Sequence, residues 1–216
     1  MMLKAALFDF DGTLVDTTEM IYQGMRHAAS SVLGREDIPR EALLANVGRP
    51  LPRQMELIDA EKAELLLEAY RHHHEENHDA LIRAFPDVAR DLSRLQAAGI
   101  TVAVVTSKRR TSVEMALNNF PDLRDVVDRF VTMEDTREHK PHPEPLWRGL
   151  ELVGDVPKEE AAYVGDSPFD VEAAKAAGLT SVAVSWGAFS EDRLREADPD
   201  HLVPDIQSAV DVLLSL

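Results

Sequence analysis

Short apolar runs alternate with helical patterns along most of this chain, and this alternation limits the possible folds more than any other feature. The strand-like runs are Ala5 to Phe8, Thr101 to Val105, Arg129 to Thr132, Ala161 to Val164, Ser181 to Val184 and a short one at His201 to Val203. Most are separated by a helical pattern that ends at a glycine or near a proline, which are common helix stops. Strands that alternate with helices form parallel βαβ units. We therefore predict an α/β fold built around a parallel sheet.

The stretch from Thr17 to Leu81 departs from this alternation, because it contains helical patterns and no strand candidate. The predicted helices are Thr18 to Leu33, Arg40 to Asn46, Leu51 to Ile58 and Glu61 to His78. Gly48-Arg49-Pro50 interrupts them. We predict a helical domain of residues 16–82 inserted after the first strand, and a sheet domain of residues 1–15 and 83–216. The two joins, near Val15-Asp16 and Ile82-Arg83, are expected to act as hinges.

The charge balance argues against nucleic acid as a partner. The chain has 216 residues, with 39 acidic and 23 basic side chains and a formal net charge of −16, whereas non-specific nucleic-acid binding depends on Lys and Arg. It has no cysteine, so a metal would be held by oxygen or histidine ligands. No apolar run approaches the ~20 residues of a membrane span, and the first residues do not resemble a signal peptide. We expect a cytoplasmic protein, monomeric or homodimeric, with no membrane or nucleic-acid partner.

The first strand ends abruptly in two carboxylates, Asp9 and Asp11, followed by Gly12-Thr13. Residues two apart on a strand point to the same side, and ligands of open α/β sheets bind at the carboxyl ends of the strands. Two carboxylates ~4 Å apart repel each other by roughly 4 kcal/mol at an effective dielectric constant of 20. A cation, a shared proton or a reaction would explain the pair. The ordinary alternative is that both are turn residues before a glycine.

Three further strand ends carry polar side chains. Thr106-Ser107-Lys108 follows the second strand, Lys140-Pro141 follows the third, and Gly165-Asp166-Ser167-Pro168-Phe169-Asp170 follows the fourth. Each set alone has an ordinary explanation, such as a turn residue, a surface lysine or a first-turn aspartate. A parallel sheet places them all on one edge, where carboxylates suit Mg²⁺ and a hydroxyl and an amine suit a phosphoryl group. An aspartate can itself be the nucleophile of phosphoryl transfer.

Taken in order, these four motifs resemble those of the haloacid dehalogenase superfamily, and the helical insert falls where the type 1 cap of that family lies. The resemblance implies a doubly wound, Rossmann-like sheet of strand order 3-2-1-4-5. It implies that Asp9 is the nucleophile and a metal ligand, and that Asp11 is the general acid and base, with its backbone carbonyl on Mg²⁺. Thr106 would hold the phosphoryl group and Lys140 would position Asp9 and the phosphate. Asp166 would bind Mg²⁺, and Asp170 would bind it directly or support a ligand.

Within that superfamily the chain looks like the phosphoglycolate phosphatase group, so the resemblance implies hydrolysis of a small phosphate ester through an aspartyl phosphate. A pyrophosphatase of the same family and a β-phosphoglucomutase-like phosphomutase remain open alternatives. Substrate choice would come from the insert: we expect Arg49, and with it Arg53, to contact a second anionic group, because guanidinium suits carboxylate and phosphate. Ser107 and Lys108, next to Thr106, are expected to face the phosphate.

Two interpretations from other classes compete. His74-Glu75-Glu76-Asn77-His78 matches the H-E-x-x-H pattern of zinc proteases, in which two histidines on one helix bind the metal. A receiver-type signalling module also uses an aspartate, a threonine and a lysine on a doubly wound sheet. Such modules lack a large insert after the first strand, and their phosphoacceptor does not follow that strand.

Overall fold

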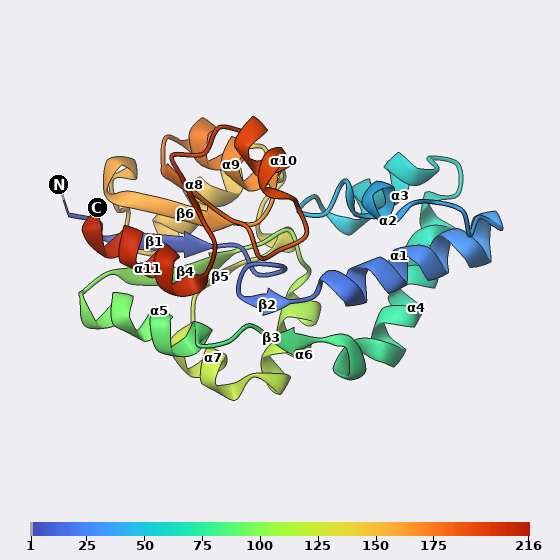
Figure 1. Cartoon of the computed structure of the whole chain (residues 1–216), viewed down its shortest axis with the longest axis horizontal. Helices are drawn as coiled ribbons and strands as arrows, with labels where there is room; N and C mark the ends of the chain where they lie inside the picture. Colours follow the sequence, from blue (N-terminus) through green and yellow to red (C-terminus); the bar gives the residue numbers. More distant parts are fainter. Residues whose placement is uncertain (1) are drawn as a thin grey trace.

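The computed structural model describes residues 2–216 and contains a six-stranded parallel sheet (Figure 1). Its strands lie in the order β5-β4-β1-β6-β7-β8. They are β1 Ala5–Phe8, β4 Thr101–Val105, β5 Phe130–Val131, β6 Ala161–Gly165, β7 Thr180–Val184 and β8 His201–Val203. The predicted order 3-2-1-4-5 is therefore confirmed, with His201–Val203 as a sixth, edge strand. The chain moves outward from β1 in one direction and then returns to β1 to extend the sheet in the other, which creates a switch point beside β1.

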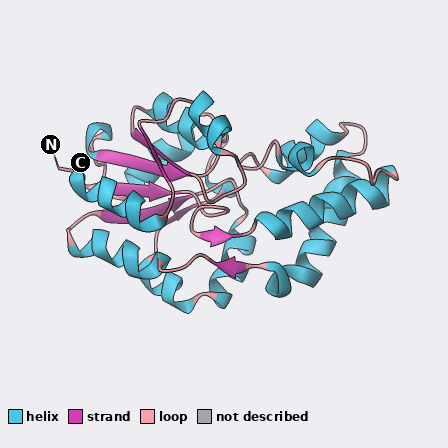
Figure 2. Cartoon of the chain, in the orientation of Figure 1, coloured by secondary structure: helices cyan, strands magenta, loops and turns pink. Residues whose placement is uncertain are grey.

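Two helical layers cover the sheet (Figure 2). Side chains of β1 alternate between the faces, so that Ala6 and Phe8 join one apolar cluster while Ala5 and Leu7 join another. The first face is covered by α5 Val88–Ala97, α6 Arg110–Asn119, α7 Pro121–Val126 and α11 Ile206–Ser215. The second is covered by α8 Glu144–Leu152 and α9 Pro168–Ala177, with α10 Glu191–Glu196 packed on α9. Short 3₁₀ turns lie at Met133–Asp135 and Lys158–Glu160.

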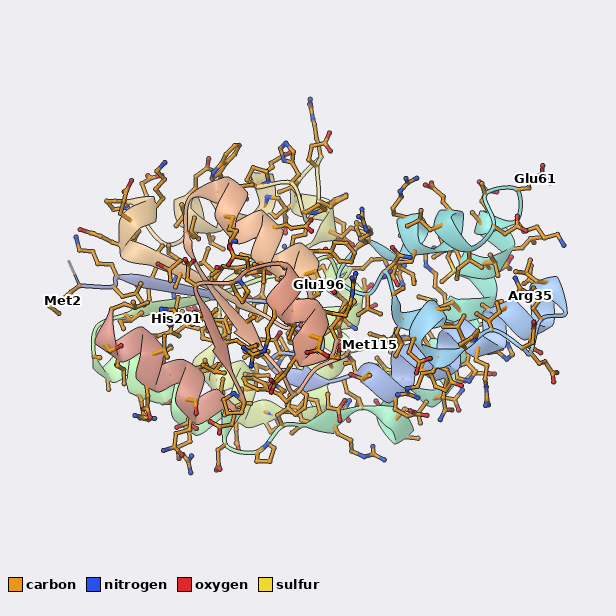
Figure 3. All side chains as sticks on the ribbon, turned by 45° about the horizontal axis from the view of Figure 1, so that its top comes forward. Met2, Arg35, Glu61, Met115, Glu196 and His201 are labelled. Carbon is orange, nitrogen blue, oxygen red and sulfur yellow. The ribbon has the colours of Figure 1, made fainter. Side chains whose placement is uncertain are left out.

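The inserted segment folds as four helices beyond the carboxyl edge of the sheet (Figure 1). These are α1 Thr18–Leu33, α2 Arg40–Leu44, α3 Leu51–Ile58 and α4 Ala63–Leu81. They enclose an apolar cluster of their own, and the main contact is between α1 and α4. Gly24 permits that contact, because a side chain there would meet the ring of Tyr70 at 2.7 Å. Arg35 and Glu61 mark the outer end of the insert, far from Met2 on the sheet domain (Figure 3).

The insert is joined to the sheet domain by an antiparallel pair of very short strands, β2 Val15–Asp16 and β3 Arg83–Ala84. This pair was not expected from the sequence, because two-residue strands are too short to carry a periodic pattern. Helix boundaries differ from those predicted by a few residues. The largest change is in α4, which runs to Leu81, three residues past the predicted end at His78. No helix among residues 2–216 combines the length and hydrophobicity needed to cross a membrane.

Candidate active site

The ends of β1, β4 and β6 bring Asp9, Thr106 and Asp166 to one place at the switch point. Backbone hydrogen bonds continue past the strands and fix these residues. The amide of Asp9 donates to the carbonyl of Val164 at 2.8 Å. The amide of Thr106 donates to the carbonyl of Val131 at 2.9 Å. All three side chains are buried. The predicted convergence of these strand ends is thus present in the structure.

A cluster of buried carboxylates forms where these strands end. Asp9, Asp166 and Asp170 each offer an oxygen, and these oxygens lie within 4.8 Å of one another. Within the described part of the chain this is the only group of three or more acidic or histidine side chains placed to share a metal ion. The backbone closes tightly around Asp166, since a side chain on Gly12 or Gly187 would overlap its carboxylate, and the amide of Ala188 donates to it at 2.8 Å.

Lys140 is the cation that faces this cluster. Its buried Nζ lies 2.7 Å from Asp170 Oδ1 and 3.0 Å from Asp9 Oδ1, and it donates to the hydroxyl of Tyr163 at 2.9 Å. That hydroxyl in turn donates to the carbonyl of Val105 at 2.7 Å. Burial works against the charged amine, but Asp170 and Asp9 outweigh it and hold the pKa of Lys140 above its ordinary value. Lys140 is therefore a fixed positive charge beside Asp9.

One lysine does not balance three buried carboxylates. Burial raises the pKa of Asp9 to about 6, with Asp170 and Asp11 adding to the effect and Lys140 opposing it. Burial, together with the charges of Asp170 and Asp9, raises the pKa of Asp166 well above its ordinary value. A cluster of carboxylate oxygens of this kind fits a hard divalent cation, whose charge would favour the ionised forms of Asp9 and Asp166.

Asp170 is the most constrained of the three. Its Oδ2 accepts from the amide of Ser167 at 3.0 Å and from the Ser167 hydroxyl at 2.6 Å, an arrangement that caps the start of α9. Its Oδ1 faces Lys140 and Tyr163. Both oxygens already have protein partners, so this geometry suits Asp170 as a residue that positions Lys140 and Ser167 as well as a metal ligand.

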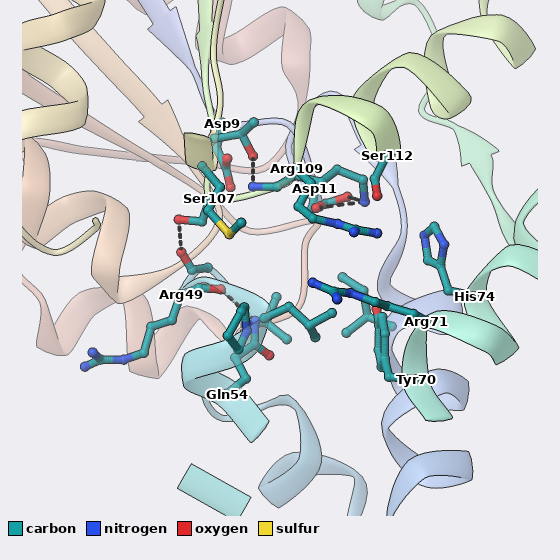
Figure 4. Close-up of a pocket in the computed structure, with 18 residues that line it drawn as sticks. Asp9, Asp11, Arg49, Gln54, Tyr70, Arg71, His74, Ser107, Arg109 and Ser112 are labelled. Atoms are coloured by element: carbon teal, nitrogen blue, oxygen red, sulfur yellow. Dashed lines mark hydrogen bonds and ion pairs between the residues drawn. The ribbon is translucent and has the colours of Figure 1, made fainter. Parts of the chain in front are cut away.

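A cavity of about 70 Å³ lies between the carboxylate cluster and the insert (Figure 4). The sheet domain contributes Asp9, Asp11 and the Thr106-Ser107-Lys108 segment, and the insert contributes Gly48, Tyr70, Arg71 and His74. Lys108 Nζ lies 2.8 and 3.1 Å from the two oxygens of Asp11. The hydroxyl of Ser107 donates to the carbonyl of Gly48 at 2.7 Å, which links the two parts of the chain. Ser107 and Lys108 therefore both lie at the cavity, as expected.

The arginines expected to meet a second anion are placed differently. Arg49 borders the cavity, but its guanidinium lies over the ring of Phe169, 4.3 Å from the ring centroid, and its side chain leads away from Asp11 (Figure 4). Arg53 is exposed and pairs with Glu56 at 2.7 Å. Two other arginines, Arg71 of α4 and Arg109 just before α6, extend into the cavity instead (Figure 4). Neither arginine was among the site residues predicted from the sequence, and only the position of Arg109 next to Thr106-Ser107-Lys108 could have drawn attention to it.

The zinc-protease pattern does not form a metal site in this structure. His74 and His78 are buried in α4 with their ring centroids 5.2 Å apart, whereas Glu75 is exposed and belongs to no candidate metal cluster of the described residues. Burial, with the positive charges of Lys108 and His78, lowers the pKa of His74 to about 3. His74 and His78 are therefore buried side chains of the insert, and His74 is neutral near pH 7.

Known proteins that match this chain belong to a family of hydrolases, which is consistent with the geometry of the site. Residues 6–184 match the family model described as haloacid dehalogenase-like hydrolase. The chain is 38% identical over 213 residues to a candidate pyrophosphatase PpaX of Caldanaerobacter subterraneus, covering 99% of this chain and 96% of that one. It is 34% identical over 213 residues to a pyrophosphatase PpaX of Bacillus mycoides, covering 99% and 98%.

Solved structures share the fold. A candidate haloacid dehalogenase-like hydrolase of Bacteroides fragilis has a TM-score of 0.86 at 26% identity, covering 96% of this chain and 99% of that one. A candidate phosphoglycolate phosphatase of Haemophilus somnus has a TM-score of 0.84 at 22% identity, covering 97% of each chain.

Proposed function

Because the chain belongs to the haloacid dehalogenase-like hydrolases, we propose that it is a Mg²⁺-dependent phosphohydrolase whose substrate is inorganic pyrophosphate. The observation that carries this proposal is the set of cationic side chains that line the cavity beside Asp9. Lys108, Arg71 and Arg109 border the cavity. A small substrate with several negative charges suits this lining better than a sugar phosphate whose departing group is neutral.

The full-length likeness to chains named pyrophosphatase supports the same choice. Phosphoglycolate, the substrate first expected from the sequence, is the second candidate, because its carboxylate also suits guanidinium groups.

In the proposed reaction an oxygen of Asp9 attacks the phosphorus, and the bond from phosphorus to the bridging oxygen breaks. Asp11 gives a proton to the departing oxygen, so an aspartyl phosphate and orthophosphate are formed. Asp11 then takes a proton from water, whose oxygen attacks the phosphorus and releases Asp9 and a second orthophosphate. Lys108, which lies at both oxygens of Asp11, has to release one of them for this proton transfer.

The remaining residues would position the substrate and Asp9 and neutralise their negative charges. Thr106 would donate to an oxygen of the transferred group, and Lys140 would hold Asp9 in place and offset its charge. Asp9, Asp166 and Asp170 would hold Mg²⁺, with the backbone carbonyl of Asp11 as a further ligand. When bound, the cation neutralises charge on the phosphoryl oxygens. We propose that the helical insert is the cap that covers this site and excludes water.

The test is kcat/KM with Mg²⁺ for pyrophosphate, phosphoglycolate, glucose phosphates and nucleotides. We expect pyrophosphate to exceed every other substrate by ~100-fold or more, which is about 2.7 kcal/mol of transition-state preference. A similar preference for phosphoglycolate would replace the proposed substrate. Equal, slow activity on all of them would contradict a dedicated pyrophosphatase.

A further inference from the structure

Two arginines share the cavity without an acidic partner. Arg71 reaches it from α4 of the insert and Arg109 from the sheet domain, and Figure 4 shows both side chains extending into the space beside Asp11. Among residues 2–216, neither guanidinium lies within ion-pair distance of a carboxylate, whereas Lys108 pairs with Asp11 and Lys140 with Asp9 and Asp170. The Nε of Arg71 is buried and has no hydrogen-bond partner.

This arrangement is unfavourable in the absence of a ligand. Both side chains are partly buried, and burial together with the charge of Arg109 lowers the pKa of Arg71, against a smaller opposing effect of Glu75. Removing a charged group from water without a partner is costly, so such groups are normally paired. Two unpaired guanidinium groups that face the same cavity indicate a binding site for an anion between them.

The position of Asp11 indicates which part of the substrate this anion is. Asp9, Thr106 and Lys140 surround the place of the transferred phosphoryl group, and Asp11 acts on the oxygen that departs. The departing group therefore lies on the Asp11 side of the cavity, which is the side that Arg71 and Arg109 border.

We propose that Arg71 and Arg109 together bind the departing anionic group of the substrate and make the enzyme selective for substrates that carry such a group. This inference rests on the proposed phosphohydrolase function but not on pyrophosphate as the substrate. Since Arg71 belongs to the insert and Arg109 to the sheet domain, a bound anion would also hold the two parts together. A substrate without a second charge would leave the two guanidinium groups repelling each other.

The experiment compares substrates that differ in the second group alone. Pyrophosphate carries a second phosphoryl group, phosphoglycolate carries a carboxylate, and 2-hydroxyethyl phosphate carries a neutral hydroxymethyl group in place of that carboxylate. For Arg71→Ala and Arg109→Ala, we expect kcat/KM to fall by roughly 10- to 150-fold on the charged substrates, the range for one hydrogen bond to a charged group. On 2-hydroxyethyl phosphate we expect a change of less than about 3-fold. Arg71→Lys keeps the charge but not the fork, and should recover part of the loss.

Arg35→Ala is the matched control, because Arg35 is an exposed arginine of the insert that pairs with Asp37 at 3.4 Å and lies at its outer end (Figure 3). It should behave as the wild type on all three substrates. Calorimetric binding of methylenediphosphonate and of methylphosphonate gives a readout without turnover. The two alanine variants should weaken binding of the first compound and leave binding of the second unchanged.

The outcomes separate this inference from the proposed substrate. If the wild type prefers phosphoglycolate to pyrophosphate, and the variants remove its advantage over 2-hydroxyethyl phosphate, the pyrophosphatase proposal is wrong and the anion site stands. If Arg71→Ala and Arg109→Ala slow all three substrates equally, or none, while melting temperatures stay near that of the wild type, the anion site is wrong. If Arg71→Ala does not fold, Arg71→Lys and Arg109→Ala decide between the same outcomes.

Discussion

Asp9 and Asp11 lie two residues apart but have different partners in the folded protein. Asp9 is buried against Lys140, whereas Asp11 faces the cavity and contacts Lys108. A group that must attack phosphorus benefits from being fixed, and a group that must exchange protons benefits from access to the departing oxygen and to water. The environments of the two aspartates therefore suit the two proposed roles.

Substitution of each aspartate tests this division. Asp9→Asn should lower kcat by more than about 10⁴-fold, because the amide is not a nucleophile. Asp11→Asn should lower kcat by ~10²–10⁴-fold, the usual value of general acid and base help. The measurement is steady-state hydrolysis of the preferred substrate by each purified variant. An Asp9→Asn enzyme with near-normal kcat would overturn the assignment of the nucleophile.

The charge of the carboxylate cluster predicts how metal affects stability. The folded-state pKa of Asp9 is about 6, above its ordinary 3.8, so between these values the folded protein holds more protons than the unfolded chain. Without metal, this group therefore contributes less stability as pH rises through that window. Mg²⁺ binds the ionised form, so its stabilising effect should be larger at pH 8 than at pH 5.

At about 100 times its dissociation constant, a bound ion adds about 2.7 kcal/mol of stability, which corresponds to ~5–10 °C in melting temperature for a chain of this size. Melting curves with Mg²⁺ and with a chelator at both pH values provide the measurement. Asp166→Asn should abolish the response to Mg²⁺ and raise the melting temperature of the metal-free protein, because it removes an unbalanced buried charge. A metal-free variant that melts below the wild type would contradict this account of the cluster.

At the scale of the element, α4 presents one buried face to α1 and to the cavity. Tyr70, His74 and His78 lie on that face, and the rings of Tyr70 and His74 are stacked with centroids 6.0 Å apart. On the opposite face the exposed side chains of His72 and Glu76 contact each other, with Nδ1 of His72 3.3 Å from a carboxylate oxygen of Glu76. Histidines in this helix thus divide into packing residues and surface residues, a division that their run in the sequence does not show.

This division predicts a pH effect on stability. The pKa of His74 falls from 6.5 to about 3 on folding, so between these values the unfolded chain binds a proton that the folded protein does not. Stability from this group is complete above about pH 6.5 and is lost as pH falls, by up to about 1.4 kcal/mol per pH unit. His74→Gln should therefore lose less stability between pH 7 and pH 5 than the wild type. Urea unfolding at the two pH values measures the difference.

His72→Gln provides the control for this experiment, because the side chain of His72 is 70% exposed and lies on the same helix. It should retain the pH dependence of the wild type. Identical slopes for His74→Gln and the wild type would show that folding does not lower the pKa of His74.

Sequence alone could predict the features that depend on local patterns, but not those that depend on contacts between distant parts of the chain. Asp9, Thr106 and Asp166 directly follow apolar strands, so the local pattern placed them at the sheet edge, and the parallel topology brought them together. Lys140 was expected there too, but not its contact with Tyr163. The directions of Arg49 and Arg71 depend on how the insert packs against the sheet domain: Arg49 lies over Phe169, more than a hundred positions away in the chain. No local pattern encodes such a contact.

At the scale of the whole molecule, the insert and the sheet domain meet around the cavity. The chain passes between them only through β2 and β3, and Ser107 contributes a direct hydrogen bond to Gly48. A two-residue antiparallel pair leaves the neighbouring loops free to change their backbone angles, which is typical of hinges. With Arg71 on one side and Arg109 on the other, we expect the empty enzyme to favour a more open arrangement and an anion to favour closure.

Energy transfer between two fluorescent labels tests this movement. Because the chain has no cysteine, Glu61→Cys on the insert and Glu196→Cys on the sheet domain (Figure 3) would provide two unique labelling positions. Methylenediphosphonate with Mg²⁺ should change the transfer efficiency, and methylphosphonate with Mg²⁺ should change it much less. The combination Arg71→Ala with Arg109→Ala should remove the difference between the two compounds, because the second phosphonate would then have no cations to bring together. If both compounds change the transfer efficiency equally in the labelled protein with Arg71 and Arg109 intact, closure depends on the first phosphonate group alone.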